Sequence, residues 1–172
     1  MGAGELAFSL HSFFPGYILY DQHGQDRVVR DGNFEFFGAP IGNDEFCASS
    51  TKQRVVEASK TISAICKHTD PQIGLRLLRS CSGFCKMVYS VRVIAPHAHM
   101  AELRRFDSLV RQAFSDLTGL HPTDAEWDQA TRGFDSAGLG LRSIVVEGLG
   151  ADLASRANSW APCRQTGEHF TG

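Results

Sequence analysis

The chain has 172 residues, a formal net charge of −2 and a hydrophobic fraction of 42%. This length suits a single domain with a packed core. The slightly negative balance excludes a globally basic nucleic-acid-binding protein, so contact with nucleic acid would need a local patch of cations. No apolar run approaches the roughly 20 residues that cross a bilayer, and we expect no membrane partner.

The cysteines favour an intracellular protein. Their number, five, is odd, and three of the first four occupy apolar positions of predicted helices, which favours reduced thiols over a disulfide framework. The N-terminus has no cationic stretch followed by a long apolar one, so we expect no secretory signal. The cysteines are Cys47, Cys66, Cys81, Cys85 and Cys163.

The first 30 residues are the least regular part of the chain. The stretch LAFSLHSFFPGYILY is apolar and aromatic but is broken by Pro15 and Gly16, which leaves open one or two short strands or a remnant of a larger domain. The Asp-Gly dipeptide at 31–32, with alternating residues around it, predicts a β-hairpin. Glycines then flank Ala-Pro-Ile at 38–42 and predict a tight turn with an exposed backbone.

A first long helix follows the turn. Asn43 or Asp44 can cap it, and its apolar periodicity continues to about Lys67. Its cations are expected on solvated sides of the helix; they are Lys52, Arg54 and Lys60.

A second long helix is predicted for Pro71–Val93, with Asp70 as its cap and Pro96 beyond its end. Apolar residues recur every three or four positions and predict one wide stripe that other segments must cover. The opposite face carries three cations and no carboxylate. The stripe consists of Leu77, Leu78, Cys81, Phe84, Cys85, Val88 and Val91, and the opposite face of Arg76, Arg79, Lys86 and Ser90.

The rest of the chain predicts a third long helix and two shorter ones. The third helix spans 99–117 and ends at Gly119. A short helix starts at Thr123, with Glu126 in the capping-box position, and a last one spans about 143–159.

The predicted fold is therefore mainly α. A short N-terminal β-hairpin leads into a bundle of three long helices, and two shorter C-terminal helices follow. Short connections place neighbouring helices antiparallel. We divide the chain into an irregular segment at 1–30, a hairpin-plus-bundle domain at 31–160 and a flexible polar tail at 161–172.

Four stretches, in order, resemble reverse transcriptases of non-LTR retrotransposons and their relatives. FEFFGAPIGNDEF at 34–46 resembles the turn that closes the palm hairpin of that family, often called the primer grip, after which the helical thumb follows. DPQIGLRLLRSCSGFCKMVYSVRVIAP at 70–96 and FDSLVRQAF at 106–114 come next in the family's order. SAGLGLRS at 136–143 resembles its Gly-Gly-Leu-Gly-Leu-Arg-Ser, with Ala137 in place of the first glycine. The resemblance covers most of the chain, from about residue 33 to 160.

The resemblance implies a thumb-like domain that grips a template–primer duplex by its backbone and has no polymerase activity of its own. Two-metal nucleotidyl transfer needs carboxylates that hold both ions, and the family supplies them from a Tyr-x-Asp-Asp box and an earlier Asp of the palm. This chain has no Asp-Asp pair, and its Tyr20-Asp21 is followed by Gln22 and His23. Residues 1–30 would then be a palm remnant, and the chain a fragment, a decayed copy or one exon of a longer gene product.

The candidate contacts with nucleic acid are the glycine-flanked turn and the cationic face. The turn would approach a primer end through its backbone, and the cations would follow the phosphates of an RNA–DNA or DNA duplex weakly and without sequence specificity. The alternatives are an ordinary turn, an ordinary solvated face and, for the whole domain, a protein partner, which the negative charge favours. The candidate residues are Gly38, Ala39, Pro40, Ile41, Gly42, Arg76, Arg79 and Lys86.

No metal, cofactor or catalytic site is predicted. Cys81 and Cys85 lie one predicted helical turn apart, with His97 and His99 nearby in sequence, but they lack the Cys-x-x-Cys spacing of structural zinc sites. Cysteines on an apolar stripe are usually small buried hydrophobes. Trp127 is expected to anchor its short helix to the core.

Overall fold

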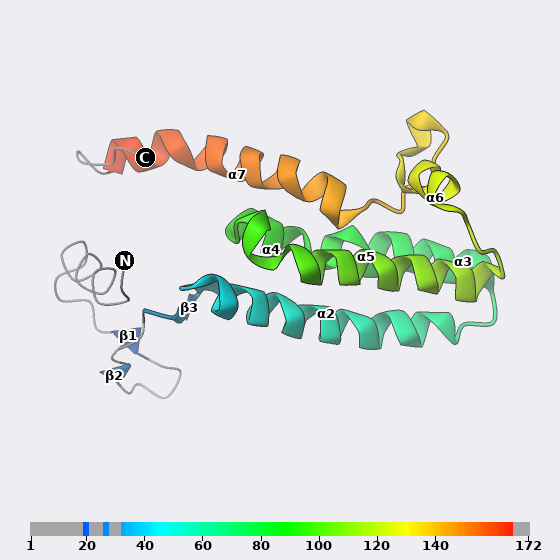
Figure 1. Ribbon diagram of the computed structural model, residues 1–172, viewed down its shortest axis with the longest axis horizontal. Coiled ribbons are helices and arrows are strands. Elements are labelled where there is room, and N and C mark those ends of the chain that lie inside the picture. The colour runs from blue at the N-terminus through cyan, green and yellow to red at the C-terminus, as the bar shows by residue number, and fades with distance from the viewer. Residues whose placement is uncertain (1–18, 21–25, 28–31, 167–172) are drawn as a thin grey trace.

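The fold of the computed structural model is mainly helical, and a short antiparallel hairpin precedes the long helices, as the sequence predicts (Figure 1). The structure describes residues 19–20, 26–27 and 32–166. Most of the segment at 1–30, and the end of the predicted tail at 167–172, lie outside the described residues. Strand β1 (Leu19–Tyr20) pairs antiparallel with β2 (Asp26–Arg27), and β3 (Phe34–Phe36) with β4 (Ala39–Ile41).

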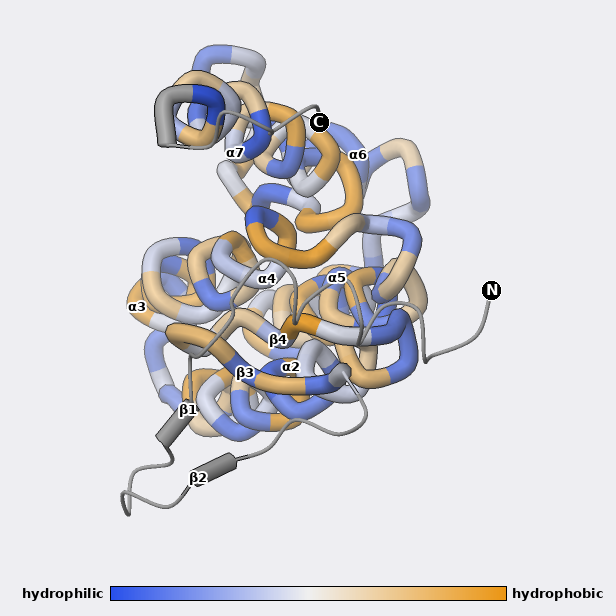
Figure 2. Tube along the Cα trace, turned by 90° about the vertical axis from the view of Figure 1, so that its left-hand side faces the viewer, coloured by the Kyte–Doolittle hydropathy of each residue, from blue (hydrophilic) through white to orange (hydrophobic). Residues whose placement is uncertain are grey.

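The long helices alternate in direction along the chain. Helix α2 runs away from the hairpin, the leg formed by α3 and α4 returns, α5 runs parallel to α2, and α7 returns again (Figure 1). The end-on view separates three layers: α2 on one side, α3, α4 and α5 in the middle, and α7 on the other side (Figure 2). The bounds are Asp44–Cys66 for α2, Pro71–Leu77 for α3, Val88–Val93 for α4, Pro96–Thr118 for α5, Asp124–Thr131 for α6 and Ile144–Thr166 for α7.

The predicted helix caps are confirmed. The Asn43 side chain accepts a hydrogen bond from the first turn of α2, and Asp70 does the same for α3. Thr123 and Glu126 cap α6 reciprocally, as a capping box requires. Gly119 ends α5 in the left-handed conformation, at φ 70°. These local signals fix where the helices start and stop.

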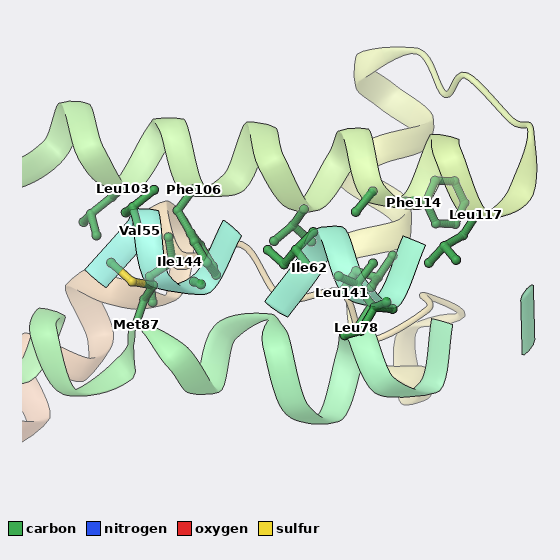
Figure 3. Packing of buried hydrophobic residues seen from close by; sticks show 14 of the residues in the cluster. Val55, Ile62, Leu78, Met87, Leu103, Phe106, Phe114, Leu117, Leu141 and Ile144 are labelled. Carbon is green, nitrogen blue, oxygen red and sulfur yellow. The ribbon is translucent and has the colours of Figure 1, made fainter. Parts of the chain in front are cut away.

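The hydrophobic core runs along the middle of the bundle, where every layer contributes side chains (Figure 3). Burying such residues is the main favourable term in folding, at about 1.5–3 kcal/mol for each large side chain. Trp127 packs against this core from α6 and lies beside the Phe114 ring, which confirms its expected role. The largest fully buried apolar side chains are Phe106, Leu78, Met87, Leu103, Ile144, Val55 and Val91.

The predicted continuous helix over 71–93 is wrong. Helix α3 ends at Leu77, a π-helical turn follows at Leu78–Ser82, and Gly83 leaves the helical conformation at φ −82° and ψ −134°. A 3₁₀ turn at Phe84–Lys86 then leads into α4. A Cβ atom at Gly83 would lie 3.0 Å from the carbonyl oxygen of Leu78, so this close approach favours glycine.

The break changes which residues face the core. Leu78 and Met87 are both fully buried, although nine residues of regular α-helix would turn them about 180° apart. The π-helical turn and the break bring both side chains to the same side. The predicted stripe is therefore wrong in register: Cys81 and Cys85 are exposed, and Ser90 is buried.

The described hairpin lies later in the chain than predicted. Its two-residue turn is Phe37-Gly38, and the predicted turn at 38–42 supplies strand β4. Both turn residues have positive φ, 49° and 76°, as a two-residue hairpin turn of type I′ requires. The other predicted turn, at 31–32, has only Gly32 within the described residues.

The last helix is longer than predicted. Helix α7 has 23 residues, as many as α2 and α5, so it is a fourth long helix and not one of two shorter ones. It continues through Pro162 to Thr166, whereas the sequence predicts a flexible tail from residue 161. Good helix formers on both sides of its centre, Ala154, Ala157 and Ala161, favour this extension.

Candidate nucleic-acid interface

The hairpin turn presents an aromatic side chain on an unusual backbone. Phe37 has φ 49°, a conformation that bulky residues rarely adopt, and its side chain is 87% exposed. Its ring makes an edge-to-face contact with the ring of Phe36, with 4.5 Å between centroids. The tip of the hairpin is therefore apolar, exposed and held in a costly conformation.

Two helices hold this tip. The hydroxyl of Tyr89, in α4, donates a hydrogen bond of 2.8 Å to the carbonyl oxygen of Phe37. The guanidinium of Arg54, in α2, donates to the carbonyl oxygen of Gly38 and lies 5.1 Å from the centroid of the Tyr89 ring. The turn is thus fixed to the helices by its backbone, and the Phe37 side chain is left facing solvent.

The rest of the glycine-flanked motif is tied into the fold. Pro40 is buried, and its carbonyl oxygen lies 3.6 Å from the thiol sulfur of Cys47 in α2. A Cβ atom at Gly42 would lie 2.1 Å from Oδ1 of Asn33, which accepts a hydrogen bond from the Asn43 amide. The second glycine is therefore explained by packing within this chain. Ala39 is half-buried and Ile41 is exposed.

Lys86 lies beside the hairpin. It lines an open groove of about 550 Å³ together with Arg54 of α2 and Glu35 of β3. Glu57, which forms a 2.7 Å ion pair with Lys60, also lines it. This groove carries both signs of charge, so it does not select an anionic ligand by electrostatics alone.

Arg76 and Arg79 lie together in another groove, of about 440 Å³, along α3. Arg76 is exposed, whereas Arg79 is half-buried and its guanidinium lies 4.7 Å from the centroid of the Phe134 ring. Asp70 also lines this groove, but its carboxylate caps α3. Arg79 therefore helps to hold the loop at 133–143, and Arg76 is the more available cation.

The structure thus brings the candidate residues together in two groups. The hairpin and Lys86 form one group: the hairpin lies at the end of the bundle where α2 begins (Figure 1), and Lys86 lines the same groove as Glu35 of β3. Arg76 and Arg79 form the other, toward the end where α2 finishes and α3 starts (Figure 1). The cations of both groups belong to one leg of the bundle, which extends from α3 to α4.

The sequence does not identify the residues that anchor the hairpin. Arg54 was expected on a solvated side of its helix, but it is half-buried and bonded to the turn. Tyr89 belongs neither to the predicted apolar stripe nor to the cationic face. Neither contact has a local signal, because each joins residues at least 16 positions apart.

The cysteines and histidines considered for zinc are dispersed. Cys81 and Cys85 are exposed, while His99 is buried and shares a 2.8 Å hydrogen bond with Thr51 of α2. Burial lowers the pKa of His99 to about 4, since it disfavours the charged ring; nearby His97 lowers it further, and Asp152 partly opposes this. Within the described residues, no three His, Cys, Asp or Glu side chains are grouped to hold a metal ion.

Two further findings complete the description. In the part of the chain that the structure describes, no helix combines the length and apolar character that crossing a bilayer demands. No protein-family model, curated protein or solved structure matches this chain.

Proposed function

We propose that this chain is a thumb-like domain that binds the backbone of a nucleic-acid duplex through the leg from α3 to α4 and the adjacent hairpin. The proposed role is similar to that of the thumb in the reverse transcriptases that the four sequence motifs resemble. It rests on the charge of one segment and on the position of the hairpin beside it.

The observation that carries the proposal is the charge of the leg. From Pro71 to Ala101 the chain contains four cations and no carboxylate, in a protein whose net charge is −2. Phosphate contacts of this kind give sequence-independent binding that falls steeply with salt. The cations are Arg76, Arg79, Lys86 and Arg92.

The hairpin adds an apolar contact next to these cations. The exposed Phe37 ring can stack on a base or on the sugar of a strand end, as aromatic side chains do in single-strand binding. Because the turn is fixed through Tyr89 and Arg54, binding would not have to order it first. On this proposal the chain binds nucleic acid and does not itself transfer nucleotides, since its sequence has no Asp-Asp pair.

A titration with an RNA–DNA hybrid tests the proposal. Fluorescence anisotropy at low salt should give saturable binding, with an affinity that falls as salt is raised. The double variant Arg76→Glu, Lys86→Glu should weaken binding and reduce the slope of log K against log salt by about 1–2, because each phosphate contact contributes about 0.9. Arg79 is left unchanged because it also holds Phe134.

A matched control separates this effect from net charge. Arg104 and Arg105 are exposed cations on α5, outside the leg, and reversing both changes the net charge by the same amount. The control variant should bind nearly as the parent does. Equal losses in both double variants, or no binding by the parent at low salt, would contradict the proposal.

A protein partner is the second candidate. Phe36, Phe37 and Ile41 expose apolar surface at the hairpin, beside a groove of mixed charge that includes Glu35. Such a surface suits a protein contact, where an apolar centre is rimmed by polar groups. If this candidate is right, the chain does not bind nucleic acid. The parent and the variant Arg76→Glu, Lys86→Glu then behave alike in the titration.

A further inference from the structure

Helix α7 has apolar residues on both of its sides. Ile144 and Gly148 face the bundle, and the Gly148 backbone lies so close to Val91 that a Cβ atom would approach its side chain to 3.2 Å. The opposite side carries Val146, Leu149 and Leu153, which are 72%, 55% and 66% exposed. A strip of exposed apolar side chains on a helix normally marks a surface that another chain or segment covers.

The exposed side of α7 forms a continuous strip, which we call the outer face. It is defined by Val146, Leu149, Gly150, Leu153, Ala157 and Ala161, and Trp160, which is 44% exposed, lies on the same side of the helix. These positions recur every three or four residues over about 22 Å of helix. The larger aliphatic side chains lie in the N-terminal half of the strip, and the alanines lie in the C-terminal half together with Trp160.

We propose that the outer face of α7 binds the same face of a second copy of this chain, with the two helices antiparallel. A two-fold axis near residue 155 would set Leu153 of one copy opposite Ala157 of the other, and Leu149 opposite Ala161. Large side chains then meet small ones at these positions, and Trp160 of one copy lies opposite Gly150 of the other, which lets the helices approach closely and interdigitate.

The charges at the two ends of the strip are complementary in an antiparallel pair. Glu147 lies at the N-terminal end of α7 and Arg164 at the C-terminal end, and both are exposed. Antiparallel pairing brings the carboxylate of one copy to the guanidinium of the other twice, at the two ends of the contact. The helix dipoles are also opposed in this arrangement, whereas a parallel pair would align them.

The size of the strip sets the expected strength. One helix face is smaller than the roughly 800 Å² per partner of a standard specific interface, so we expect a reversible dimer in the micromolar range. Sedimentation equilibrium of the full chain over about 5–500 μM should therefore show a concentration-dependent monomer–dimer equilibrium. A parent chain that stays monomeric over this range overturns the proposal.

Substitutions locate the contact. Leu153→Glu should abolish dimerisation, because it sets two carboxylates near the two-fold axis. Leu120→Glu is the matched control, since Leu120 is 61% exposed in the loop after α5 and lies outside the outer face. Dimerisation that survives Leu153→Glu, or that is lost equally in the control, overturns the proposal.

A charge swap tests the antiparallel geometry. Glu147→Arg should weaken dimerisation about tenfold, because two ion pairs are lost, and adding Arg164→Glu to the same chain should restore it. Circular dichroism checks that each variant keeps its helices. Failure of the second substitution to restore the dimer rules out this pairing. If the parent is monomeric and Leu153→Glu lowers its unfolding temperature, another part of the same chain covers the outer face instead, and the proposal is also wrong.

Discussion

At the scale of one residue, the backbone conformation of Phe37 lowers the stability of the fold at the candidate site. A positive φ costs an ordinary L-residue about 1–2 kcal/mol, and Phe37 regains little of this by burial because its side chain is almost fully exposed. Asparagine and glycine occupy this turn position at lower cost. Folding therefore does not explain the phenylalanine, whereas the proposed contact with nucleic acid would.

Phe37→Asn should stabilise the chain and weaken its binding. Asparagine tolerates the left-handed conformation, so the free energy of unfolding should rise by about 1 kcal/mol in a urea titration. The affinity for the RNA–DNA hybrid should fall, since the aromatic contact is removed. Phe36→Asn serves as the control, because Phe36 lies in a strand and gains no such relief. A Phe37→Asn variant that is less stable than the parent would contradict this account of the turn.

At the scale of an element, α7 is held at its start by a residue of another helix. Asp107 of α5 accepts hydrogen bonds from the Ser143 hydroxyl and from the amides of Ile144 and Val145, at 2.9 and 3.3 Å for the amides. Burial raises the pKa of Asp107, while these three hydrogen bonds lower it. A carboxylate at a helix N-terminus also meets the positive end of the helix dipole.

Asp107→Ala should loosen α7 selectively. The variant leaves three donors without their acceptor, so we expect a loss of about 2–3 kcal/mol in the free energy of unfolding. Hydrogen exchange should show faster exchange of the α7 amides than of the α2 amides. Asp116→Ala, at an exposed site on the same helix, should change stability by less than about 0.5 kcal/mol. Equal effects of the two substitutions would show that Asp107 does not cap α7.

Local signals in the sequence predict where most of the helices begin. They do not predict which side of the leg from α3 to α4 faces the core. The caps at Asn43, Asp70 and Thr123 satisfy amides within one turn of themselves, so the sequence alone locates them. The break at Gly83 has no such signal, because glycine also occurs inside helices. The π-helical turn rotates the following residues relative to a regular α-helix. A stripe counted at 100° per residue therefore no longer faces the core, and Cys81 and Cys85 lie at the surface.

The candidate site is likewise predicted only in part by the sequence. The sequence points to the glycine-flanked segment at 38–42 and to the cations of the leg, because glycines and charges are visible without tertiary structure. It does not predict that this segment forms strand β4. It misses Arg54 and Tyr89, whose roles exist only once α2 and α4 lie side by side at the turn. It also treats Arg79 as a free cation, although Phe134, 55 positions away, holds it.

For the whole molecule, His99 connects several layers of the bundle. Its own backbone is non-helical, at φ −136° and ψ 18°, and forms a kink near the start of α5. Its ring shares a hydrogen bond with Thr51 of α2. Asp152 of α7 is close enough to affect its charge. His99 is only 1% exposed, so a proton on its ring would place a charge where three helices meet.

The stability of the whole fold should therefore fall between pH 7 and pH 4. The pKa of His99 is about 4 in the folded chain and about 6.5 when unfolded, so in this window the unfolded state binds the extra proton. Protonation favours the state that binds more protons, and the difference of about 2.5 units corresponds to about 3 kcal/mol lost by pH 4. Below the folded pKa this contribution stays lost.

Urea titrations across this range test the expectation, with His99→Gln to isolate the contribution. The variant should lose stability more gently than the parent between pH 7 and pH 4, since glutamine keeps a polar partner for Thr51 and does not titrate. His97→Gln is the control, because His97 is exposed and only weakly paired with Asp44, at 3.8 Å. Its profile should stay close to the parent's, with a slightly smaller loss because His97 helps to lower the pKa of His99. Parallel profiles for the parent and His99→Gln would mean that the buried ring is protonated in the folded chain at little cost, and that the junction of the helices admits a charge.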